Sequence, residues 1–174
     1  MFLTKLGECY IELRRYDEAE RSLRDALQEK ADEPLAHYDL GLVYEARREP
    51  AQAIAEYRAE LTRNPKTYRA HFNLAKLLAA AGRTSEAVQH FQQAVEANPE
   101  FGSGYLYLAK ARLDIGDLDG AEAAATKGMT LQPDREIAPL GHYVLADVYS
   151  RQGRERDAQR EAAAGRRLEQ RRVG

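Results

Sequence analysis

The sequence predicts an all-α protein, an α-solenoid of five helix-turn-helix repeats with about ten helices, and three observations carry this prediction. A leucine recurs at spacings of 34, 34, 34 and 37 residues, a residue with almost no side chain follows each leucine, and a column of alanines keeps the same phase. The leucines are Leu6, Leu40, Leu74, Leu108 and Leu145, and the alanines are Ala19, Ala53, Ala87, Ala121 and Ala158. Self-similarity at this period, with two helical patterns per unit, indicates stacked pairs of helices.

Each repeat contains two amphipathic patterns, which the second repeat displays best. In residues 37–46, His37, Leu40 and Tyr44 fall on one face of a helix with 3.6 residues per turn. In residues 51–61 the apolar side chains recur at similar steps, while the charged ones point largely elsewhere. The second helix of a repeat is therefore expected to pack on the first.

Glycine and proline mark the ends of these helices. Glycines that can take a positive φ separate the two helices of the last three repeats, at Gly82, Gly116 and Gly153. Pro65, Pro99 and Pro133 close repeats two to four. The predicted repeats are 1–33, 34–67, 68–101, 102–138 and 139–174, within a single domain, and the longer junction at 133–141 is expected to be a rigid turn.

The first helices carry the motif by which the chain resembles the tetratricopeptide repeat (TPR) family: a large residue, then leucine and a small residue, then tyrosine. The motif stands as HYDLGLVY (37–44), HFNLAKLL (71–78), YLYLAKAR (105–112) and HYVLADVY (142–149). The resemblance covers nearly the whole chain. It implies a right-handed superhelix whose first helices line a concave groove, and a protein that binds a peptide segment or a partner helix there.

The same resemblance assigns the groove lining in this sequence. The expected binding residues are Tyr38, Asp39, Leu42, Arg69, Phe72, Asn73, Lys76, Leu106, Tyr107, Lys110, Tyr143 and Asp147. Aromatic side chains with nearby cations are typical of binding hot spots. Asn73 can donate to and accept from the backbone of an extended ligand. The family also uses tyrosine and asparagine in these columns to support the fold, so both roles remain open.

One ligand class of the family is not expected. Members that bind the C-terminal tails of Hsp70 or Hsp90 hold the terminal carboxylate with two lysines, an arginine and two asparagines. The corresponding positions here are Thr4, Glu8, Asp39, Arg69 and Asn73. Only two of these five fit, and the two acids would repel a carboxylate.

Metal, cofactor and catalytic sites are not expected either. Cys9 is the only cysteine, so the chain can form no internal disulfide, and helical spacing predicts that Cys9 is a buried, small apolar residue. His37, His71 and His142 share one repeat position on the helix-pairing face. Equivalent helices lie about 10 Å apart, too far for these imidazoles to share a zinc ion. The sequence carries no recognised catalytic motif, so we expect no enzyme activity.

Three functions remain open at this stage. The first is a protein-interaction scaffold. The second is a C-terminal accessory region of a larger bacterial enzyme, because residues 140–154 are similar to repeat tails of sulfatase-like hydrolases. The third is a spacer with an unused groove. No apolar run is long enough for a membrane span and no signal peptide is visible, which leaves the compartment undetermined.

Two further expectations concern the ends of the chain. The net charge of −2 and the lack of aromatic residues beside the arginine-rich segment 166–172 argue against nucleic-acid binding. The first helix carries more apolar surface than one partner helix covers, which predicts self-association or an upstream element.

Overall fold

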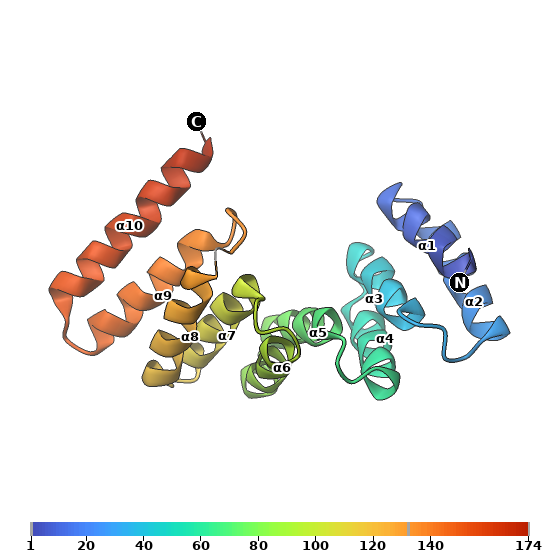
Figure 1. The fold of residues 1–174 in the computed structure, drawn as a ribbon, viewed down its shortest axis with the longest axis horizontal. Helices are drawn as coiled ribbons and strands as arrows, with labels where there is room; N and C mark the ends of the chain where they lie inside the picture. Colours follow the sequence, from blue (N-terminus) through green and yellow to red (C-terminus); the bar gives the residue numbers. More distant parts are fainter. Residues whose placement is uncertain (1, 132, 174) are drawn as a thin grey trace. The chain divides into compact units, whose positions relative to one another are not determined.

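The structure, a computed structural model, describes residues 2–131 and 133–173, with side chains up to residue 171 (Figure 1). All regular structure within these residues is helical, and the predicted fold class, an all-α solenoid of helix-turn-helix repeats, is confirmed. The helices are α1 (Phe2–Glu12), α2 (Tyr16–Glu29), α3 (Ala36–Ala46), α4 (Pro50–Arg63), α5 (Tyr68–Ala80), α6 (Thr84–Ala97), α7 (Gly102–Asp114), α8 (Leu118–Thr130), α9 (Ala138–Arg151) and α10 (Glu155–Val173). The side chain of Arg172, in the arginine-rich segment, lies outside the described residues.

The helices belong to two compact units, residues 1–77 and 78–174. Unit 1 contains α1 to α4 and most of α5. Unit 2 contains the end of α5 and α6 to α10. The boundary falls inside the third predicted repeat, and the single-domain organisation stays a prediction.

Each unit has its own core, formed by the repeat columns. In unit 1, Ala19, Leu40, Ala53 and Leu74 are almost completely buried. In unit 2, the equivalent leucines and alanines are buried as well: Ala87, Leu108, Ala121, Leu145 and Ala158. The recurrence that predicted the fold therefore marks the residues that hold neighbouring helices together.

The small residue after each leucine allows the two helices of a repeat to approach closely. A Cβ atom added to Gly41 of α3 would lie 2.6 Å from Cδ1 of Tyr57 on α4. A Cβ atom at Gly7 of α1 would lie 2.6 Å from Cγ of Leu23 on α2. In both repeats a large side chain of the second helix occupies the space that the glycine leaves free.

A left-handed residue ends the first helix of every repeat. Gly82, Gly116 and Gly153 take φ values of 76°, 84° and 74°, as the sequence predicts. Arg14 and Arg48, at the same position in the first two repeats, take φ values of 57° and 62°. The residue after each turn donates its N–H to a carbonyl oxygen five positions earlier, for example Glu49 to Tyr44 at 2.8 Å. This bond satisfies a carbonyl at the end of the helix, so the turn persists even where arginine must adopt its φ.

Helix α1 differs from the prediction in the exposure of its cysteine, and large apolar side chains at its two ends are exposed, as expected. Cys9 is exposed, not buried. Cys9 is two positions after Gly7, which faces α2. Two positions correspond to about 200° around the helix, so Cys9 lies on the side away from α2. Phe2 and Leu13 are 79% and 65% exposed. Among the described residues, no helix has both the length and the apolar character needed to cross a membrane.

Candidate binding surfaces

Unit 1 brings three of the predicted binding residues to one shallow pocket. Leu42 from α3 and Asn73 and Lys76 from α5 line a pocket of about 420 Å³, and Glu45 and Ala46 complete its lining. The pocket offers an apolar side chain, a carboxamide, an ammonium group and a carboxylate within one volume. This mixture suits a polypeptide backbone with its side chains.

Tyr57 of α4 is bonded to two of the residues that line this pocket. It is fully buried, and its hydroxyl donates to Glu45 Oε2 at 2.8 Å. Asn73 Nδ2 donates to the same hydroxyl at 3.4 Å. The ring of Tyr38 lies 5.8 Å from that of Tyr57. Burial, with the neighbouring Glu45 carboxylate, raises the pKa of Tyr57 far above its usual range, so this hydroxyl stays protonated and keeps donating.

An aromatic ring and two cations lie on the same helix. Lys76 Nζ lies 5.7 Å from the ring centroid of Phe72 and 3.5 Å from Glu45 Oε1. Arg69 is exposed, with its Nε 3.2 Å from the hydroxyl of Tyr68. The predicted association of an aromatic residue with cations therefore exists on α5, and its lysine also lines the pocket.

Asp39 does not line a surface, which corrects the prediction. Its side chain is buried, with only 5% of the residue exposed, and its Oδ2 atom has no hydrogen-bond partner among the described residues. Burial first, and then the charges of Glu8 and Glu60, raise the pKa of Asp39 to about 7, while Lys5 opposes the shift. The repeat pattern within α3 could not show this, because it depends on neighbouring helices: α1 contacts α3, and Lys5 and Glu8 of α1 lie near enough to act on the Asp39 carboxyl.

In unit 2, Leu106 is also buried and not on the surface. It is completely inaccessible. A Cβ atom added to Gly128 of α8 would lie 2.6 Å from Leu106 Cδ2, and one at Gly141 of α9 would lie 3.0 Å from it. Leu106 therefore fills the space left by two glycines. Tyr107, its neighbour, is half-buried and stacks on Phe91 with ring centroids 5.9 Å apart.

The charged residues predicted for the groove in unit 2 are paired on their own helices. Lys110 pairs with Asp114 one turn along α7. Asp147 accepts from Arg151 Nε at 2.9 Å on α9. The Tyr143 hydroxyl donates to Glu169 Oε2 of α10 at 2.7 Å. These groups of unit 2 are therefore engaged within the unit, as Lys76 is with Glu45 in unit 1.

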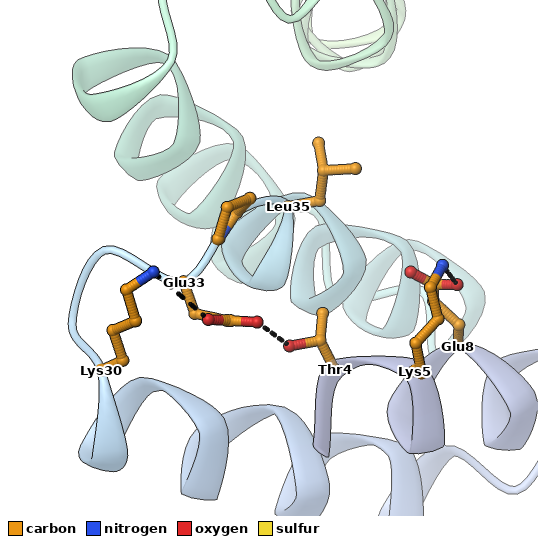
Figure 2. Close-up of a pocket in the computed structure, with 7 residues that line it drawn as sticks. Thr4, Lys5, Glu8, Lys30, Glu33 and Leu35 are labelled. Atoms are coloured by element: carbon orange, nitrogen blue, oxygen red, sulfur yellow. Dashed lines mark hydrogen bonds and ion pairs between the residues drawn. The ribbon is translucent and has the colours of Figure 1, made fainter. Parts of the chain in front are cut away.

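A second pocket in unit 1 was not predicted. Figure 2 shows this volume of about 330 Å³ between the start of α1 and the connection from α2 to α3. Its lining residues are Thr4, Lys5, Glu8, Lys30, Glu33, Pro34 and Leu35. Thr4 Oγ1 donates to Glu33 at 3.0 Å, and Lys5 pairs with Glu8 at 2.6 Å. The connection follows no repeat pattern, so the repeat analysis did not predict a pocket there.

Two of the three equivalent histidines bond within their own repeats, and the third bonds to the end of the preceding repeat. His37 Nδ1 lies 2.7 Å from Glu56 Oε2, and His142 Nδ1 lies 2.8 Å from Glu161 Oε2. His71 Nε2 lies 3.0 Å from the carbonyl oxygen of Pro65, and burial lowers its pKa. Over the part of the chain that the structure describes, no three His, Cys, Asp or Glu residues are grouped so as to hold a metal ion.

Comparison with known families agrees with the repeat geometry. One profile described as "Tetratricopeptide repeat" matches residues 4–67 and again 38–100, and a second profile of the same description matches residues 78–140. The chain belongs to the tetratricopeptide repeat family. This TPR protein has a further repeat beyond the matched ranges. It consists of α9 and α10, which form another helix pair joined by a turn of the same three-residue length. A comparison with curated proteins gives no significant match.

Solved TPR structures share this fold at low sequence identity. MamA 41-end from Desulfovibrio magneticus RS-1 is 18% identical, with 99% of this chain and 96% of that chain covered and a TM-score of 0.83. YrrB, described as a TPR protein with an unusual peptide-binding site, is 16% identical, with coverages of 95% and 84% and a TM-score of 0.82. PilF of Pseudomonas aeruginosa is 24% identical, with coverages of 94% and 74% and a TM-score of 0.75.

Proposed function

We propose that this TPR protein is a non-catalytic interaction scaffold that binds an extended peptide segment at the unit 1 pocket lined by Leu42, Glu45, Ala46, Asn73 and Lys76. The observation that carries the proposal is the convergence of Leu42, Asn73 and Lys76 on that one pocket. A similar structure, YrrB, is described as having a peptide-binding site, which is in keeping with this use of the fold.

The chemistry of the pocket defines the kind of segment that it suits. The Asn73 carboxamide can pair with a backbone amide of the ligand, which fixes an extended segment without selecting its sequence. Leu42 offers a contact for an apolar side chain, and Lys76 attracts an acidic one. Glu45 already lies 3.5 Å from Lys76 and partly neutralises its charge. The ammonium group should therefore orient an acidic ligand side chain more than it raises the affinity for the ligand.

The buried Tyr57 makes the pocket pre-organised. Its hydroxyl joins Glu45 of α3 to Asn73 of α5, so the two walls are connected before a ligand arrives. Pre-organisation reduces the entropy lost when a ligand binds.

Peptide selection from a random library of 12-residue sequences displayed on phage tests this proposal. A selected peptide is then titrated, by fluorescence polarisation, against the wild type, Asn73→Ala and Lys76→Ala. Loss of a hydrogen bond or charged contact worth about 1 kcal/mol weakens binding roughly fivefold. Lys127→Ala, at an exposed position on α8, is the matched control and should bind like the wild type. Peptides that bind all four proteins equally would refute the assignment of the pocket.

A further inference from the structure

The chain enters α3 in a conformation that the equivalent helices α5 and α7 do not share. Helices α5 and α7 begin at Tyr68 and Gly102, and the corresponding residue of the second repeat is Pro34. Helix α3 begins two residues later, at Ala36, and Leu35 before it is left-handed, with φ 63° and ψ −2°. This conformation is costly for a leucine, and backbone strain of this kind clusters at ligand-binding sites in proteins.

Leu35 is also exposed, and it lies beside a hollow between two connections. The residue is 41% exposed, and Figure 2 shows its side chain pointing away from Thr4 and Glu33. The hollow, of about 480 Å³, lies between the connection before α3 and the connection from α4 to α5. We call it the junction pocket, and its described lining residues are Pro34, Leu35, Arg63, Asn64, Pro65, Lys66 and Thr67. None of these residues lines the unit 1 pocket proposed above for peptide binding.

Hydrogen bonds hold the two walls of the junction pocket. Arg63 Nε donates to the carbonyl oxygen of Ala31 at 3.1 Å, which ties the end of α4 to the connection before α3. Beneath the other wall, the buried Glu60 accepts from Asn64 Nδ2 at 2.8 Å and from Thr67 Oγ1 at 3.3 Å. The other repeats have a small residue at the position of this acid: Ala26, Ala94, Gly128 and Gly165. The second repeat therefore has a polar anchor of its own under this connection.

The surface of the junction pocket is positively charged. Arg63 and Lys66 are both exposed, and no acidic side chain is among the described residues that line the pocket. The Arg63 guanidinium donates to two carbonyl oxygens, those of Ala31 and Ala59. Within the part of the chain that the structure describes, neither cation forms an ion pair with a carboxylate. Both charges are therefore available to a ligand, whereas Lys76 of the unit 1 pocket already lies 3.5 Å from Glu45.

We propose that the junction pocket binds an acidic segment of a partner polypeptide, which places a large apolar side chain against Leu35 and carboxylates near Arg63 and Lys66. Contact with the apolar side chain would remove the exposed surface of Leu35 from water. A carboxylate can accept two parallel hydrogen bonds from a guanidinium. The pocket suits a peptide better than a nucleic acid, because its apolar residues are leucine and proline and no aromatic ring lines it for bases to stack on.

Selection on the full chain carrying Asn73→Ala and Lys76→Ala tests the junction pocket separately from the unit 1 pocket. Random 12-residue peptides displayed on phage are selected at low salt on this parent variant, after circular dichroism has shown that it is folded. The proposal predicts that the selected sequences combine acidic residues with a large apolar residue. One selected peptide is then labelled with fluorescein and titrated by fluorescence polarisation.

Two further substitutions in the same parent variant separate the two kinds of contact. Leu35→Asn removes the apolar contact and introduces a residue that tolerates the left-handed conformation, so affinity should fall roughly fivefold with the salt dependence unchanged. Lys66→Glu reverses one charge and leaves the hydrogen bonds of Arg63 intact, so affinity should fall roughly fivefold or more and depend less on salt. Lys127→Glu, at an exposed position on α8, makes the same change of charge and should bind like the parent variant.

Three results would overturn the proposal. The first is a selection that does not enrich acidic and apolar residues over the starting library. The second is a selected peptide that binds Leu35→Asn and Lys66→Glu as tightly as it binds the parent variant. The third is tighter binding of a fluorescein-labelled 12-nucleotide oligothymidine than of the selected peptide, which would assign the two cations to a nucleic acid. None of these results bears on the unit 1 pocket, because two of its lining residues are already substituted in the parent variant.

Discussion

Replacing Gly41 by alanine should destabilise unit 1, although alanine favours helices. The added Cβ atom would lie 2.6 Å from Tyr57 Cδ1 and 2.9 Å from Cζ, whereas ordinary contact begins at 3.4 Å. The ring atom Cε1 would lie closer still, so the ring must move by more than about 0.8 Å, the difference between 3.4 and 2.6 Å. It has little freedom to do so, because Tyr57 is completely buried and its hydroxyl is bonded to Glu45.

The expected loss follows from three contributions. Overpacking a core costs about 1–3 kcal/mol, and weakening the bond to the Glu45 carboxylate costs roughly 1 kcal/mol more. The higher helix propensity of alanine over glycine offsets about 1 kcal/mol of this loss of stability. The net destabilisation is roughly 2 kcal/mol, which for a unit of this size lowers the melting temperature by roughly 8–16 °C.

Thermal melting followed by circular dichroism measures this loss, and a second background tests its cause. In Tyr57→Leu, which removes the ring, Gly41→Ala should stabilise the protein by about 1 kcal/mol, because only the helix propensity remains. The sign of the effect therefore depends on Tyr57. An equal or higher melting temperature for Gly41→Ala in the wild-type background would refute the argument from close packing.

Three other changes have defined outcomes. Arg48→Gly relieves a left-handed residue and should stabilise unit 1 by up to about 1 kcal/mol in urea denaturation; a loss of stability would show that the arginine is not strained. Glu20→Gln weakens the contacts to Tyr44 and Arg47 and should cost about 1 kcal/mol, less in 1 M salt, and an effect independent of salt would contradict a charge-based contribution. The folded pKa of Asp39 is raised from 3.8 to about 7, so wild-type stability should fall between these pH values; Asp39→Asn should gain on the wild type across that window, by at most about 4 kcal/mol, and a constant difference would contradict the raised pKa.

The sequence predicted the helix pairs and the core because both depend on local periodicity. The leucine and alanine columns recur where each repeat meets its neighbour, so one rule covers every repeat. The glycine turns were predicted for the same reason. Arg14 and Arg48 take that conformation without a sequence signal, because the hydrogen bonds of the turn, and not the residue type, impose it.

Exposure at the candidate site was harder to predict, because it depends on which side chains neighbouring helices supply. Leu106 is buried because Gly128 and Gly141 leave room for it. Asp39 is buried on α3, which α1 contacts. Cys9 is exposed because it lies on the side of α1 away from α2. Leu42, Asn73 and Lys76 were predicted as binding residues, and they line one pocket because α3 and α5 present them to the same volume.

Site-specific photo-crosslinking tests most directly whether this pocket binds a partner. Benzoylphenylalanine placed at Ala46, which is exposed and lines the pocket, is compared in lysate of the source organism with the same group at Gln28, exposed on α2. If the pocket binds a partner, a crosslinked polypeptide is expected at position 46 that is absent at position 28 and lost when Asn73→Ala and Lys76→Glu are added. The same adducts at both positions, or an adduct at position 46 that survives these two substitutions, would contradict binding at this pocket.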